Sequence, residues 1–70
     1  MAIAWTEIEP YVQRAFDAAG RVERADVIDL AYADNANDDV VDAIDAIGSR
    51  VFNTIDDAKS FLTSQNHVSG

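Results

Sequence analysis

The stretch that decides the fold is NDDVVDAIDAI, residues 37–47, which Gly48 follows. Asn37 can cap a helix with its side-chain oxygen, and the two aspartates after it fall in the first turn, where the helix dipole favours negative charge. Its largest apolar residues recur at i, i+4 and i+7, so one face carries Val40, Ile44 and Ile47. Glycine readily takes the left-handed conformation that ends a helix. The stretch therefore predicts a short amphipathic helix at 38–47, with Ile44 at the centre of the core.

The opposite face of this predicted helix is acidic. Asp38, Asp42 and Asp45 recur there at the same spacing, and we interpret them as a candidate partner-binding row. The whole chain has 13 acidic and five basic residues, which gives a net charge of −8 at pH 7. Such a charge repels nucleic acid phosphates and anionic membranes. No apolar run approaches the roughly 18 residues that a membrane helix needs, so we expect neither direct nucleic acid binding nor membrane insertion.

A first helix is predicted at about 7–19, but its start has two candidates. Thr6 and Glu9 have capping-box spacing, which would place Trp5 just before the helix. Alternatively, Glu9 is the cap and Pro10 takes the first helical position, where its missing N–H costs nothing. Both alternatives leave Trp5 outside the helix, where an exposed tryptophan would suit an interface.

Two more helices are predicted at 24–34 and 55–63, the first ending at a left-handed Asn35 and the second capped by Thr54. Between the last two helices, residues 51–52 (Val-Phe) are expected to form a buried, extended anchor, the one place where a two-residue strand is conceivable. The predicted fold is therefore all-α, a bundle of four short helices in a single domain at residues 1–63. Residues 64–70 are polar and are expected to form a flexible tail.

Three segments carry a resemblance to a known family: ADVIDLA at 25–31, the stretch at 37–47, and FNTIDDA at 52–58 with Leu62. With them, residues 22–62 resemble a family of small bacterial proteins that is known only as a domain of unknown function. That family tends to have Gly where Asn35 stands here, and Pro-Asp where this chain has Gly-Ser after residue 47. The resemblance implies a helical fold and no activity, because no activity is established for the family.

Candidate catalytic and metal-binding groups are few. Read as a calcium-binding loop, NANDD at 35–39 would need glycine where Val40 stands and glutamate where Ala46 stands. Adjacent aspartates point apart on a helix, the chain has no cysteine, and its one histidine, His67, lies in the expected tail. The sequence therefore predicts no catalytic residue, no metal ligand and no cofactor.

The remaining hypothesis is a protein–protein interaction module with an unidentified protein partner, or in a variant a homodimer. The residues proposed for partner binding are Trp5, Asp38, Asp42 and Asp45. An acidic DNA mimic, or a regulator that binds a basic protein, is the alternative within the binding class. A metal-dependent enzyme is the contrasting class, motivated only by the density of carboxylates. The N-terminal sequence does not resemble a signal peptide, so a cytoplasmic location is expected.

Overall fold

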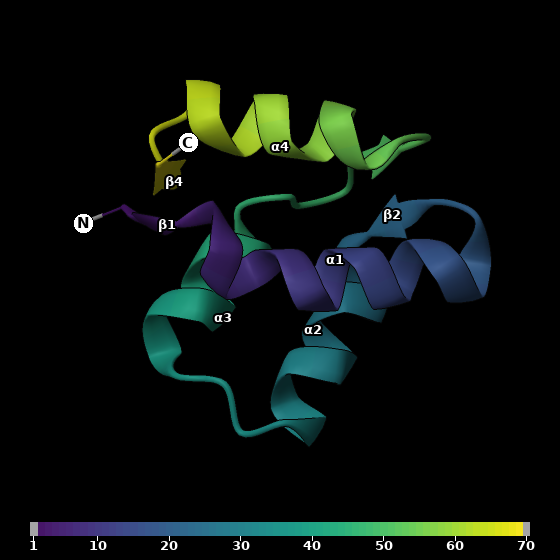
Figure 1. Cartoon of the computed structure of the whole chain (residues 1–70), viewed down its shortest axis with the longest axis horizontal. Helices are drawn as coiled ribbons and strands as arrows, with labels where there is room; N and C mark the ends of the chain where they lie inside the picture. The colour runs from purple at the N-terminus through teal and green to yellow at the C-terminus, as the bar shows by residue number, and fades with distance from the viewer. Residues whose placement is uncertain (1, 70) are drawn as a thin grey trace.

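The structure is a computed structural model, which describes residues 2–69. The described chain forms four helices: α1 (Trp5–Ala19), α2 (Arg24–Ala33), α3 (Asp38–Asp45) and α4 (Ile55–Ser64). Helix α1 contacts each of the other three helices. It lies between α4 on one side and α2 and α3 on the other (Figure 1). The four predicted helices are confirmed, with ends that differ from the prediction by one or two residues.

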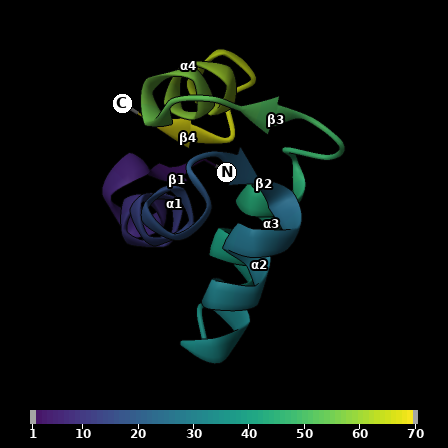
Figure 2. The ribbon, with the colours of Figure 1, turned by 90° about the vertical axis from the view of Figure 1, so that its right-hand side faces the viewer.

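Two small sheets connect the helices, so the prediction of an all-α bundle holds only as a mostly helical fold. Strand β1 (Ile3–Ala4) pairs in parallel with β4 (Val68–Ser69), and β2 (Val22–Glu23) pairs antiparallel with β3 (Val51–Phe52). Figure 2, which looks along α1, shows β1 and β4 between α1 and α4, and β3 reaching from α4 toward β2. Of these strands, only the one at residues 51–52 was considered possible from the sequence. The expectation that this segment is buried is wrong for Val51, which is exposed.

The segment expected to be a flexible tail is part of the fold as far as Ser69, while Gly70 lies outside the described residues. Helix α4 ends in a Schellman motif. Asn66 takes a left-handed φ of 63°, and the His67 N–H donates a 2.9 Å hydrogen bond to the Leu62 carbonyl. This turn directs the chain back toward β1 and places Val68 in the core, where it is 2% exposed. Burial of Val68 therefore outweighs the polar composition on which the tail prediction depended.

Helix α1 begins earlier than either predicted start. Its N-cap is Ala4, whose backbone N–H donates a 3.1 Å hydrogen bond to the Glu7 side chain. Pro10 consequently lies inside the helix, where its ring removes one backbone hydrogen bond. The pairing of β1 with β4 fixes the backbone up to Ala4. Burial of Trp5 then favours a helix that begins at Trp5 itself. These tertiary contacts override the local capping signals.

The core follows the predicted helical faces. Ile44 is fully buried, as predicted, and the other apolar residues below 2% exposure are Ile8, Val12, Val22, Val27, Ala31, Ile47, Ala58 and Leu62. The caps predicted at Asn37 and Thr54 are confirmed, since their side-chain oxygens accept hydrogen bonds from the backbone N–H groups of Val40 and Asp57. Asn35 is left-handed at the end of α2, also as predicted.

Helix α3 ends at Asp45, two residues before its predicted end at Ile47. The N–H groups of Ile47 and Gly48 instead donate to carbonyls three residues earlier, which tightens the chain into a turn. Gly48 leaves this turn with a left-handed φ of 63°. The turn keeps Ile47 buried beside Ile44, so the apolar stripe of the sequence is longer than the helix itself.

Candidate functional site

The acidic row of α3 lies on the surface as the spacing predicted. Asp38, Asp42 and Asp45 are all exposed, while Ala43 and Ile44 between them face the core. Arg24 forms a 2.9 Å salt bridge with Asp45. The Arg24 guanidinium therefore compensates the charge at the C-terminal end of the row. The uncompensated negative charge that a partner would meet is concentrated at the N-terminal half of α3.

A polar depression of about 250 Å³ lies beside this row, between α3 and the turn that leads to β4. Its lining residues are Asp39, Asp42, Ala43, Asn66 and His67. The only histidine of the chain, expected in a tail, thus lies beside two carboxylates. The signal that could have placed it was the asparagine after α4, because the rule that identified Asn35 as a left-handed cap applies equally to Asn66.

Trp5 does not belong to an exposed surface, which corrects the expectation that it stands exposed before the first helix and removes the reason for proposing it as a partner-binding residue. Its side chain is packed into the core and only 5% of the residue is exposed. The indole N–H donates a 3.2 Å hydrogen bond to Glu9, one turn further along α1. The Lys59 ammonium lies 5.9 Å from the centre of the ring, within the range of a cation–π contact. Trp5 therefore joins α1 to α4.

Most basic residues are engaged within the domain. Arg21 pairs with Glu23 at 2.7 Å, Arg24 pairs with Asp45, and the Arg50 guanidinium lies 4.6 Å from the centre of the Phe61 ring. With Lys59 over the Trp5 ring, this accounts for all of the basic residues except Arg14. Within residues 2–69, only two carboxylates form salt bridges, so the remaining negative charge of the surface is uncompensated by the chain itself.

Two carboxylates of α2 are among those that the chain does not compensate. Within the described residues, the side chains of Asp26 and Asp29 form neither a salt bridge nor a hydrogen bond. They lie at the edge of a second depression, about 270 Å³, in the seam between α1 and α2. The two aspartates therefore belong to a hollow that is separate from the row of α3 and mostly apolar.

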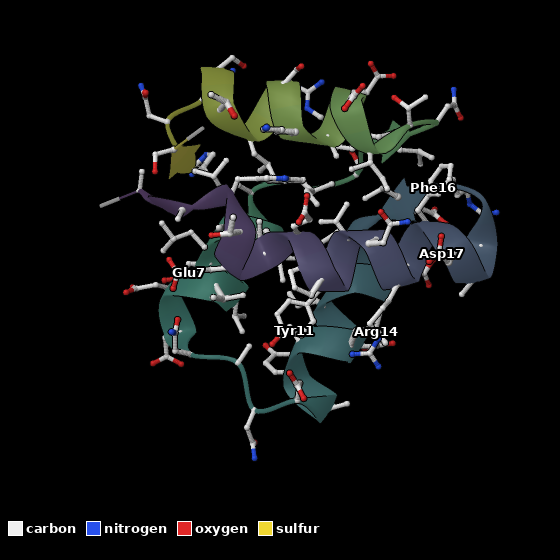
Figure 3. All side chains as sticks on the ribbon, in the orientation of Figure 1. Glu7, Tyr11, Arg14, Phe16 and Asp17 are labelled. Carbon is white, nitrogen blue, oxygen red and sulfur yellow. The ribbon has the colours of Figure 1, made fainter. Side chains whose placement is uncertain are left out.

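The other end of the α1–α2 seam is closed by a hydrogen bond. Tyr11 and Arg14 extend from α1 toward α2 (Figure 3), and the Tyr11 hydroxyl donates a 2.8 Å hydrogen bond to the Asp34 carboxylate. This hydrogen bond is the largest of the effects that raise the pKa of Tyr11 above its usual 10.0. Desolvation and the charge of Asp34 raise this pKa further, and Arg14 acts in the opposite direction.

The described part of the chain has neither a cluster of metal-binding side chains nor a helix that could span a membrane. No group of three or more histidine, aspartate or glutamate side chains converges closely enough there to hold a metal ion. No helix among residues 2–69 is both long enough and apolar enough to cross a bilayer. The residues of NANDD at 35–39 are used otherwise, since Asn35 ends α2 and Asn37 caps α3.

Comparison of the chain with models of known protein families, with curated proteins and with solved structures finds no match. The resemblance of residues 22–62 to a bacterial domain of unknown function thus remains a prediction from the sequence.

Proposed function

We propose that this domain is a protein–protein interaction module whose partner presents a basic surface. One observation carries the proposal: four of the five basic residues are engaged within the domain, and three of the four carboxylates of α3 are left without a cation among the described residues. Asp38, Asp39 and Asp42 are exposed and form no salt bridge within residues 2–69. Like charges at i and i+4 on a helix repel one another, by about 0.2–0.5 kcal/mol per pair. An external cationic surface would relieve that repulsion and speed association.

A homodimer is less well supported than a basic partner. In a symmetric dimer the same patch of each subunit meets its equivalent. Two copies that each carry a charge of −8 would then bring uncompensated carboxylates together if they met through α3.

The proposal is tested by immobilising the domain and capturing proteins from the cells in which it occurs. At low salt, we expect a captured protein with a basic surface that is released as the salt rises to about 0.5 M, because exposed charges are screened within a few ångströms at such concentrations. The captured protein is then purified, and its affinity is measured against the salt concentration. An affinity that does not change with salt, or a purified protein that does not bind at all, would contradict the proposal.

A further inference from the structure

The seam between α1 and α2 has features of a binding groove that the acidic row of α3 lacks. Three alanines of α1 and one leucine of α2 line it, and two aspartates stand beside them: Ala15, Ala18, Ala19, Leu30, Asp26 and Asp29. Its volume of about 270 Å³ is below the roughly 300–1,000 Å³ that is usual for small-molecule sites. A groove of this size and lining suits an apolar side chain from another polypeptide better than an organic cofactor.

Helix α2 carries more apolar surface than the fold covers. Val27 and Ala31 are buried, but Leu30 is only half-buried and Tyr32 is 62% exposed. Tyr32 lies three residues after Asp29, so the two side chains are neighbours on one side of the helix. Exposed tyrosines are enriched in interfaces, and their rings attract cations. Helix α2 therefore presents an exposed aromatic side chain next to Asp29, one of the two carboxylates that line the groove.

We propose that the α1–α2 groove binds a basic amphipathic segment of a partner protein, with one large apolar side chain seated between the alanines and Leu30. Lysine or arginine residues of the same segment would then face Asp26, Asp29 and the ring of Tyr32. Charge complementarity determines this choice of occupant, because both carboxylates lack a cation within residues 2–69. A second copy of this chain would instead bring further acid to an acidic margin.

This inference rests on the proposed function and adds to it a second place of contact, apart from the row of α3, and the chemistry of that contact. The probe is a synthetic helical peptide of lysine and leucine, with the leucines at helical spacing, titrated into the isotope-labelled domain and followed by NMR. We expect the largest backbone shift changes at Ala18, Ala19 and Leu30. A second peptide, with serine in place of each leucine, should bind about tenfold more weakly, because it has no side chain to fill the groove.

Variants of the groove provide the second arm of the test. Ala18→Leu fills the exposed part of the groove without changing its charge. We expect this variant to bind the lysine–leucine peptide with about tenfold lower affinity. Ser60→Leu adds an apolar side chain to the exposed face of α4 and should leave the affinity unchanged. The pair Asp26→Asn and Asp29→Asn should weaken binding by a similar factor and reduce its dependence on salt.

The outcomes separate this inference from the proposed function. Shift changes confined to α3 would overturn the groove as the site while leaving an acidic protein-binding module in place. Equal binding of the two peptides, or no effect of Ala18→Leu, would show that charge alone attracts the probe, and the groove would be excluded. Failure of the lysine–leucine peptide to bind would also overturn the inference. The proposed function would then still be tested separately, by the capture of a basic protein.

Discussion

Ile3 and Val68 lie opposite each other in a parallel pair of strands, so residues near the two ends of the chain meet in the core. The pairing closes the domain, because it holds the start of α1 against the end of α4 (Figure 1). A chain of 70 residues has little apolar surface to bury. We therefore expect the burial of Ile3 and Val68 in this contact to contribute to the stability of the domain.

Shortening Val68 should destabilise the domain. We expect Val68→Ala to lower the free energy of unfolding by about 2 kcal/mol, since it removes two buried carbons and leaves a small cavity. Ser69→Ala, in the same strand but exposed, is the control and should have a smaller effect, since it removes only the 3.4 Å hydrogen bond from the Ser69 hydroxyl to the Ile3 carbonyl. Urea unfolding measures both variants. Equal, small effects would mean that the strand does not hold the ends of the chain together.

The core and surface sides of α3 should respond very differently to truncation. Ile44→Ala is expected to cost about 2–5 kcal/mol, because Ile44 is fully buried. Asp42→Ala should change the stability by less than about 0.5 kcal/mol, since its side chain is exposed. The same unfolding measurement compares them. A larger effect at Asp42 than at Ile44 would show that the core and surface sides of α3 are assigned wrongly.

The hydrogen bond from Tyr11 to Asp34 should be visible in the titration of Tyr11. In a Tyr32→Phe background Tyr11 is the only tyrosine, and we expect its pKa by ultraviolet absorbance to lie above 10.0. Adding Asp34→Ala should return the pKa toward the ordinary value. Since the folded state raises this pKa, the contribution of the bond to stability is complete below about pH 10. It is lost as the pH rises through the higher pKa of the folded state.

Salt should stabilise the domain. Uncompensated carboxylates repel one another in the folded state, and raising NaCl from about 0.05 M to about 0.5 M screens that repulsion. We expect the midpoint of urea unfolding to rise over this range. The rise should be smaller in Asp42→Asn, which removes the repulsion between Asp38 and Asp42. A midpoint that falls with salt would indicate that attractive ion pairs, such as Arg24 with Asp45, dominate the surface.

The helices could be predicted from the sequence because their signals are local. Caps such as Asn37 and Thr54, and the apolar spacing around Ile44, act within one or two turns. Apart from the strand at residues 51–52, the strands could not be predicted, since each is two residues long and is stabilised by a segment distant in the sequence. The predicted start of α1 was wrong for the same reason, because local capping signals do not depend on the burial of Trp5 or on the pairing of Ile3 with Val68.

The candidate site was predictable only in part. Periodicity placed Asp38, Asp42 and Asp45 on one exposed face, but it could not show that Arg24 pairs with Asp45. Periodicity also could not show that His67 lines the same depression as Asp42, because the position of His67 depends on the turn at Asn66. The composition likewise gives the excess of acidic over basic residues, but it does not show which carboxylates are paired. Which carboxylates lack a partner depends on where the basic residues pack.

The central claim, that the acidic row of α3 serves binding rather than folding, is tested most directly by comparing partner capture with stability. In the variant with Asp38→Asn and Asp42→Asn, we expect the free energy of unfolding to stay within about 1 kcal/mol of wild type. Capture of the basic partner should fall about tenfold. Asp56→Asn with Asp57→Asn removes the same charge from α4 and should retain capture. Equal capture by wild type and the α3 variant, at equal stability, would contradict the account.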